Sequence, residues 1–207
     1  MRTLRVVLAV VAIGAAVVIA LLAADLRSWQ STIRDGDLRF SQNPGAAKWD
    51  ASTVLPASLS RGILGLDDQL AFRRAARRFA YVSTLGLGLD NGYSEGRARG
   101  NLEVTLTNLA RSGNPERDSA ANNMLGILAY TDSRPTGLGT PAPVDRAVSD
   151  FVAAVELDPT NEYAKFNLEW LLEHLQARGV RGGGTAGTGT SSKGHKGAAG
   201  SPPGKGY

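Results

Sequence analysis

The side chains best suited to acid–base or metal chemistry are few in this sequence and lie far apart along it. His174 and His195 are the only histidines, and the chain has no cysteine. Neither histidine belongs to an HxxxH or HExxH spacing, so no zinc site is indicated. The absence of cysteine excludes disulfides, thiolate metal ligands and cysteine nucleophiles.

Other patterns that support catalysis or phosphate binding are also missing. The sequence contains no Gly-x-Ser-x-Gly motif and no Walker A run ending in Gly-Lys-Ser/Thr. The glycine-rich stretch 85–89 does not follow a predicted strand, as a phosphate-binding loop would. Glu169 and Glu173 share one face of a predicted helix, where a solvated carboxylate pair is the ordinary interpretation. We therefore predict no catalytic residue, no metal site and no cofactor, and expect that the chain is not an enzyme.

A cluster of arginines is the best candidate for a binding surface. A helix is predicted over 67–84, with Phe79 among the residues on its apolar arc. No acidic residue of this helix lies three or four positions away to pair with the arginines. Their guanidinium groups would suit an acidic peptide or anionic headgroups. A solvated face and pairing with acids from neighbouring helices are the alternatives. The predicted partner-binding residues are Arg73, Arg74, Arg77 and Arg78.

An uncharged apolar run, Val6–Ala24, precedes all of these residues. At about 1.5 Å per residue it is long enough to cross a hydrocarbon core of roughly 30 Å as a helix. Arg2 and Arg5 lie before it, which places the N-terminus in the cytoplasm and residues 25–207 outside the cell. A cleaved signal peptide is the alternative, but its apolar core is usually shorter, and Leu22 fits the small-x-small cleavage pattern poorly. We predict an uncleaved signal anchor over 1–24.

The predicted domain, 25–178, is followed by a basic tail, 179–207, and the charges of residues 1–178 balance. The net charge of +4 comes from the tail, which has no acidic residue. A nucleic-acid-binding domain is therefore not indicated. The tail consists mostly of Gly, Ser, Thr, Ala and Pro, and we predict that it is disordered. It is either an ordinary solvated terminus or a tether for an anionic lipid or envelope polymer.

Helical periodicity dominates residues 25–178, and no strand pattern bounded by tight turns occurs. We predict an all-α fold. The helix that follows the apolar run ends at or before Asn43, and Pro56 begins a short helix that carries Leu59, Ile63 and Leu66. Further helices are predicted from about Tyr93 to Arg111, after the cap Asn114, from about Val144, and after the cap Thr160. The expected inward residues of these four helices are Leu102, Leu106, Leu109, Ala121, Met124, Leu125, Leu128, Val144, Ala147, Val148, Phe151, Val155, Ala164, Leu168, Leu171, Leu172 and Leu175.

One stretch of these helices resembles a tetratricopeptide repeat. Ala147, Phe151, Ala154 and Pro159 match the spacing A-x3-F-x2-A-x4-P of the second repeat helix, and Leu125-Gly126 matches the Leu-Gly of the first. The resemblance covers about 120–176. It departs from the family in its long loop 133–144 and in lacking a tryptophan before Leu125. A generic helical bundle is the alternative.

As a whole, the chain resembles single-span actinobacterial proteins with exported tetratricopeptide-like domains. That resemblance implies a membrane-anchored interaction module or scaffold of a cell-envelope complex, which binds a peptide or helix of a protein partner. A structural or accessory subunit of an envelope enzyme complex is the alternative.

Overall fold

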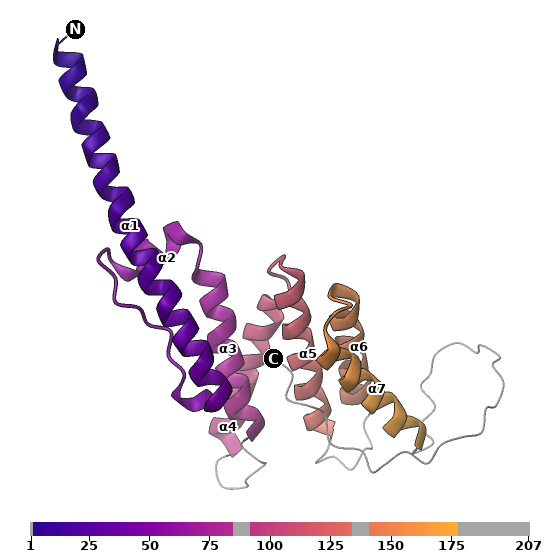
Figure 1. Ribbon diagram of the computed structural model, residues 1–207. Helices are drawn as coiled ribbons and strands as arrows, with labels where there is room; N and C mark the ends of the chain where they lie inside the picture. The colour runs from indigo at the N-terminus through magenta and orange to yellow at the C-terminus, as the bar shows by residue number, and fades with distance from the viewer. Residues whose placement is uncertain (1, 85–91, 134–140, 178–207) are drawn as a thin grey trace. The chain divides into compact units, whose positions relative to one another are not determined.

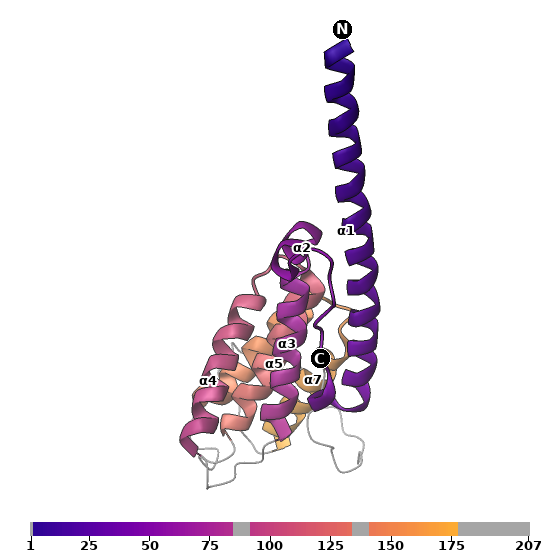
Figure 2. The same ribbon diagram turned by 90° about the vertical axis from the view of Figure 1, so that its left-hand side faces the viewer.

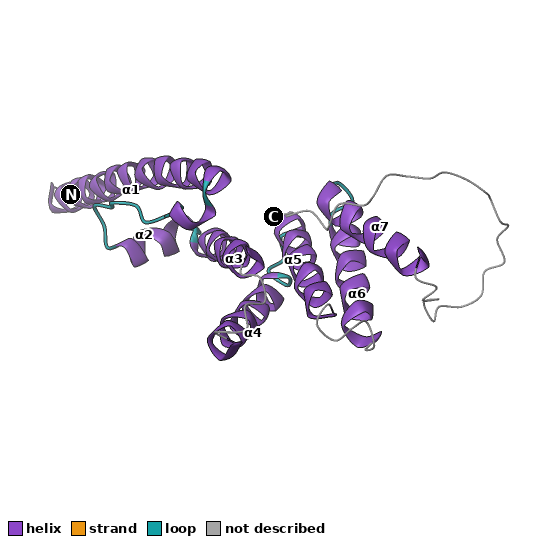
Figure 3. Ribbon diagram, turned by 90° about the horizontal axis from the view of Figure 1, so that it is seen from below, coloured by secondary structure: helices purple, strands orange, loops and turns teal. Residues whose placement is uncertain are grey.

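The computed structural model describes residues 2–84, 92–133 and 141–177. Within these ranges every regular element is helical, as predicted, with seven α-helices and one short 3-10 helix (Figures 1 and 3). The contacts divide the chain into two compact units, Met1–Thr84 and Leu85–Tyr207. The predicted domain 25–178 includes parts of both units. The predicted tail 179–207, with His195, lies outside the described residues, as do the stretches 85–91 and 134–140.

The first unit is organised around one long helix, α1 (Arg2–Gln42). This helix contains the apolar run Val6–Ala24, is long and apolar enough to cross a membrane, and buries none of its most apolar window within the protein. It continues without a break past Ala24 and ends where predicted, just before Asn43. Figure 2 shows its N-terminal half extending well beyond the other helices of the unit.

The 3-10 helix η1 (Pro44–Ala46) and the short α2 (Ala57–Leu64) pack along the C-terminal half of α1, and α3 (Asp67–Thr84) packs on η1. Asn43 caps η1, because its side chain accepts a hydrogen bond from the Gly45 amide. Gly65 ends α2 in the left-handed conformation that glycine tolerates best (φ 65°), so Leu66 follows this helix instead of belonging to it.

The core of the first unit is a small cluster of Trp29, Ala47, Trp49 and Leu70, with Ile33, Phe40, Ala51, Leu64 and Leu66 packed around it. Trp29 comes from α1, Leu70 from α3, and Ala47 and Trp49 from the connection between η1 and α2. On α3 the predicted arc is correct, because Ala75, Ala76 and Phe79 are buried. The connection thus supplies two of the four buried residues of the central cluster.

The second unit contains α4 (Gly92–Leu109), α5 (Pro115–Ser133), α6 (Pro141–Leu157) and α7 (Glu162–Ala177). Helices α5 and α6 lie side by side, α4 packs on α5, and α7 packs on both α5 and α6. Most of the predicted inward residues are buried, including Leu102, Leu106, Met124 and Phe151. Leu172 is an exception, because 41% of its surface is exposed.

The closest approach between α5 and α6 depends on a glycine. Phe151 is completely buried, and a Cβ added at Gly126 would lie 2.6 Å from two atoms of its ring. Only a residue without a side chain fits at this point of α5. The buried Ala147 and Ala154 lie one turn to either side of Phe151 on α6, where small side chains permit close packing of the two helices.

Helix termini in the second unit confirm one predicted cap and correct two other predictions. Asn114 caps α5, since its side chain accepts a hydrogen bond from the Arg117 amide at 3.0 Å. Asn161, not Thr160, caps α7 by accepting from the Ala164 amide at 3.1 Å. Thr160 is directed to Asp158 instead, because its amide and hydroxyl both donate to that carboxylate. Helix α6 begins at Pro141, earlier than predicted, because proline is compatible with a first helical turn.

Candidate functional site

The arginines predicted to bind a partner have different environments on α3. Arg73 forms a bidentate salt bridge with Asp37 of α1, with both nitrogen–oxygen distances at 2.8 Å. Arg77 donates to the Ala47 carbonyl at 2.6 Å. Arg74 approaches Asp50 only to 3.8 Å, and both side chains are largely exposed. Arg78 is also exposed. Arg73 and Arg77 therefore bond to other segments of the same unit. Of the four arginines, only Arg74 and Arg78 remain candidates for binding a partner.

A second polar group joins α1 to the connection ahead of α2. Asp25, the first residue after the apolar run, is fully buried. Its two carboxylate oxygens accept hydrogen bonds from the Val54 and Leu55 amides, at 2.6 and 3.2 Å. One turn further along α1, the Trp29 indole donates to the Ser60 hydroxyl of α2 at 3.2 Å. These contacts hold α2 and its preceding loop against α1 just beyond Ala24.

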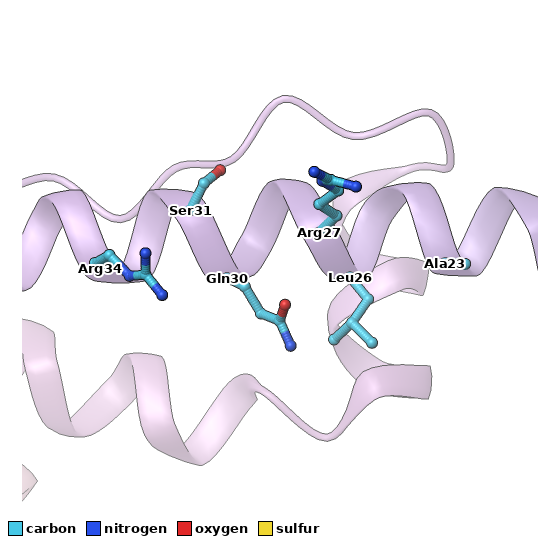
Figure 4. Close-up of a pocket in the computed structure, with 6 residues that line it drawn as sticks. All are labelled: Ala23, Leu26, Arg27, Gln30, Ser31 and Arg34. Carbon is cyan, nitrogen blue, oxygen red and sulfur yellow. The ribbon is translucent and has the colours of Figure 1, made fainter.

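Two shallow hollows follow the same stretch of α1. The first has a volume of about 490 Å³ and is lined by Ala23, Leu26, Arg27, Gln30, Ser31 and Arg34 (Figure 4). The second, of about 690 Å³, shares three of these residues and continues to Leu66 and Gln69. In Figure 4, Leu26, Gln30 and Arg34 project from one side of the helix and Arg27 and Ser31 from the other. The lining of the first hollow has little acid–base potential, because its arginines remain protonated and its other groups are neutral or apolar. The second hollow also includes Asp37, whose carboxylate is paired with Arg73.

In the second unit, buried polar side chains connect three helices. Asn167 of α7 donates to the side-chain oxygen of Asn123 of α5 at 2.8 Å, and both residues are buried. Ser119 of α5 donates to the Ala154 carbonyl of α6 at 2.7 Å and accepts from Asn161 at 2.9 Å. These bonds fix the turn between α6 and α7 against α5. They were not predicted, although Asn167 interrupts an otherwise apolar stripe between Ala164 and Leu171.

A groove of about 420 Å³ lies above these polar links, between the N-terminal halves of α5 and α7. It is lined by Glu116, Ala120, Asn123, Asp158, Thr160, Asn161, Glu162 and Tyr163. Tyr163 is 56% exposed, and on the same helix Phe166 is 45% exposed. The groove thus combines carboxylates, amides and an exposed aromatic ring, a mixture that suits a polypeptide ligand.

The charge of this groove is negative. Glu116, Asp158 and Glu162 are its charged lining residues, and Lys165 pairs with Glu162 at 2.8 Å. Hydrogen bonds from the Thr160 hydroxyl and amide lower the pKa of Asp158, so this carboxylate is ionised at neutral pH. An acid held in its ionised form by local hydrogen bonds is poorly suited to general acid catalysis. The carboxylates are better suited to attracting a cationic ligand.

The remaining candidate residues have structural or solvated environments. His174 stacks on Trp170 with ring centroids 3.8 Å apart, and its Nδ1 lies 2.7 Å from the Trp170 carbonyl oxygen. Glu169 and Glu173 are exposed on α7. Among residues 2–84, 92–133 and 141–177, no group of three or more histidines and acids is arranged to hold a metal ion.

Comparison of the chain with known protein families, curated proteins and solved structures found no match. The resemblance to tetratricopeptide repeats therefore depends on the residues of this chain alone. Its most specific part is the pairing of Gly126 with Phe151, which the sequence placed on two neighbouring helices and which are in close contact in the structure.

Proposed function

We propose that this protein is a membrane-anchored interaction module, and that its second unit binds a cationic segment of a protein partner in the groove between α5 and α7. The observation that carries the proposal is the groove itself, with its three carboxylates and exposed Tyr163. The helix α1 anchors the module in the cell membrane, with the N-terminus in the cytoplasm and residues 25–207 outside. That orientation follows from Arg2 and Arg5 ahead of the apolar run.

The arrangement of α5, α6 and α7 supports a tetratricopeptide-like interpretation of the second unit. In such arrays, each repeat is a helical hairpin, and the first helices of successive repeats line the binding surface. Here α5 and α6 would form one hairpin, and α7 would be the first helix of the next. The groove lies between α5 and α7, which would be the first helices of two successive repeats in this assignment.

The groove's chemistry specifies the type of partner segment. Its carboxylates would pair with lysine or arginine, and the exposed Tyr163 ring would pack against the aliphatic part of such a side chain. Arg74 and Arg78 on the first unit would offer a separate contact for acidic groups of the same partner. A scaffold role in a cell-envelope complex fits these features. A structural or accessory subunit of an envelope enzyme complex is the alternative.

Photo-crosslinking in intact membranes tests the proposal. A photoreactive phenylalanine analogue replaces Tyr163 in the groove or, as the control, Val104, which is 64% exposed on α4. We expect one discrete protein adduct from position 163 and none from position 104. Adducts from both positions, or from neither, would contradict a specific binding site in the groove.

Charge reversal then tests the nature of the partner segment. Glu116→Lys combined with Glu162→Lys should abolish the adduct formed at position 163. The matched control, Glu156→Lys combined with Glu173→Lys, reverses two exposed acids that do not line the groove, and should leave the adduct intact. Loss of the adduct in both variants would indicate a non-specific charge effect. An adduct that survives the double reversal would contradict recognition of a cationic segment.

A further inference from the structure

Helix α2 exposes much of its apolar surface, although its Leu64 packs on the core of the unit. Its one fully buried residue is Ser60, whereas the apolar Leu59 and Ile63 are 50% and 55% exposed. These two residues are four apart and therefore lie on the same side of the helix. Val54, in the loop just before α2, is 66% exposed. An amphipathic helix in water turns its apolar side inward, so the outward Leu59 and Ile63 are available to contact an apolar medium or partner.

The position of α2 along α1 suggests what that medium is. Asp25, which directly follows the apolar run, accepts hydrogen bonds from Val54 and Leu55, and Trp29 donates to Ser60. At about 1.5 Å per residue, these two α1 residues lie within roughly 8 Å of Ala24 along the helix axis. The headgroup layer of a bilayer is about 5–8 Å thick on each side, so the contacts with α2 fall at headgroup depth. Figures 1 and 2 both show α2 at the end of its unit toward which the free half of α1 extends.

We infer that α2 is an interfacial helix that inserts Leu59 and Ile63 into the membrane surface from which α1 emerges. This inference rests on the proposed membrane anchoring by α1. The ligand is the headgroup and upper acyl-chain region of the bilayer that α1 crosses. Val54, in the loop before α2, extends the apolar contact. Lipid is favoured over a protein partner because the exposed apolar residues of α2 lie at the same membrane depth as the end of the apolar run. A protein partner would have to bind at that depth as well.

The polar contacts of α2 are consistent with this location. Near lipid, unsatisfied backbone groups are costly, and Asp25 satisfies the two amides that precede α2. Trp29 lies at the level where tryptophan is enriched in membrane proteins, and its indole nitrogen is hydrogen-bonded. Arg61, between the two exposed apolar residues in sequence, turns toward Asp67 instead, with a nitrogen–oxygen distance of 3.5 Å. The outward side is thereby left without a charge from this arginine.

This arrangement would make α2 a second, shallow membrane contact beside a single transmembrane helix. One helix alone allows the rest of the unit to rotate and tilt relative to the bilayer. A second contact through Leu59 and Ile63 would restrict that motion and orient the Arg73–Asp37 side of the unit with respect to the surface. Binding of this kind depends on buried apolar area and is weaker than transmembrane insertion.

The experiment uses the absence of cysteine from the chain. Single cysteines are introduced by Ile63→Cys or Leu59→Cys on α2, Val18→Cys in the apolar run and Leu38→Cys as the control. Leu38 is 59% exposed on α1 but lies roughly 20 Å beyond Ala24. Each full-length variant carries an environment-sensitive fluorophore and is reconstituted in phosphatidylglycerol–phosphatidylethanolamine vesicles. Some of the lipids carry a nitroxide either near the top of the acyl chain or near its end.

We expect labels at 59 and 63 to emit at shorter wavelength than the label at 38 and to be quenched most strongly by the shallow nitroxide. The label at 18 should be quenched most strongly by the deep nitroxide, and the label at 38 by iodide in the water. If 18 is quenched by the deep nitroxide while 59 and 63 behave like 38, α2 does not bind lipid, although anchoring by α1 stands. If 18 is not quenched by lipid nitroxides, the anchoring and the inference both fail.

A second copy of the chain is the other occupant that the experiment recognises. In that case, Ile63→Cys left unlabelled would form a disulfide-linked dimer in vesicles under mild oxidation, and its labelled form would escape the shallow nitroxide. That pair of results would overturn lipid binding by α2. Monomeric protein with a strongly quenched label at 63 supports it.

Discussion

Each unit of this protein packs an aromatic ring against a glycine within a helix, but the two rings are held by different kinds of contact. In the first unit, Trp49 covers Gly36 of α1, and its indole also donates to Asp37 at 2.9 Å. In the second, Phe151 covers Gly126 of α5 within an apolar core. Trp49 comes from an irregular connection, whereas Phe151 belongs to a regular helix.

The difference shows two ways to stabilise a small helical unit without disulfides. The first unit has few core residues and relies on charged or polar side chains that bond to distant segments, such as Asp25, Asp37 and Arg77. The second buries a periodic set of alanines, leucines and Phe151 between helices, with a few polar links below the groove. We therefore expect truncation of the apolar core to affect the second unit most, and pH and charge to affect the first.

The largest effect is expected from Phe151→Ala. The side chain is completely buried, so its loss should decrease the free energy of unfolding of the second unit by about 3–5 kcal/mol. That is a large part of the roughly 5–15 kcal/mol typical of a domain. Amide hydrogen exchange of the full chain in detergent, resolved by peptide, measures each unit separately. Unchanged protection of α5 and α6 would mean that Phe151 does not hold the hairpin together.

An intermediate effect is expected from alanine at the two covered glycines. The added Cβ of Gly126→Ala would meet the Phe151 ring at 2.6 Å, and that of Gly36→Ala would meet both the Trp49 ring at 2.5 Å and the Lys48 carbonyl oxygen at 2.7 Å. Overpacking costs about 1–3 kcal/mol, which exceeds the helix-propensity gain of roughly 1 kcal/mol. Gly36→Ala should be the more costly, because a backbone carbonyl moves less readily than a side chain.

Gly100→Ala provides the matched control for this pair. Gly100 is exposed in α4, and nothing lies within 4 Å of its added Cβ. Only the propensity gain remains there, so this variant should be more stable than the natural chain by up to about 1 kcal/mol. Equal stabilisation by Gly100→Ala and Gly126→Ala would contradict the close contact between α5 and α6.

The smallest effect is an opposite response of the two units to acid. Burial tends to raise the pKa of Asp37, but hydrogen bonds from Arg73 and Trp49 and the charge of Arg73 outweigh it and lower this pKa below 3.8. The stabilising contribution of Asp37 is therefore present above its pKa in the unfolded chain, and it is lost as the pH falls through its pKa in the folded protein. Burial and the charge of Glu103 raise the pKa of Asp150 above 3.8 despite Arg146. The contribution of Asp150 to stability is therefore present below its pKa in the unfolded chain, and it is lost as the pH rises through its pKa in the folded protein.

Asp37→Asn and Asp150→Asn separate these two contributions. Asp37→Asn should destabilise the first unit at neutral pH by about 1 kcal/mol or less, because the pair is partly exposed, and should weaken its loss of stability in acid. Asp150→Asn should stabilise the second unit slightly at neutral pH. Urea unfolding at several pH values, read by peptide-resolved exchange, checks both signs. A stability change of the same sign at neutral pH in both variants would contradict the opposite environments of Asp37 and Asp150.

Several features of this protein followed from its sequence alone. The apolar run Val6–Ala24 predicted the long α1, because a helix without charges needs only length and composition to be recognised. Helical periodicity predicted the inward residues of α4, α5 and α6, and the Asn114 cap, because these patterns depend on neighbours within four residues. Gly126 and Phe151 were singled out by their resemblance to a tetratricopeptide spacing, but their contact, which joins two helices, was not predicted.

Other features were decided only by the tertiary structure. The sequence put four arginines on one face, but only the fold brought Arg73 to Asp37 and Arg77 to the Ala47 carbonyl, across more than one element. The exposure of Leu59 and Ile63 on α2 and the burial of Asp25 were not predicted either. Periodicity shows that residues share a face but not which way that face points. That direction depends on which distant segment packs on the other side, and the groove between α5 and α7 depends on the same long-range packing.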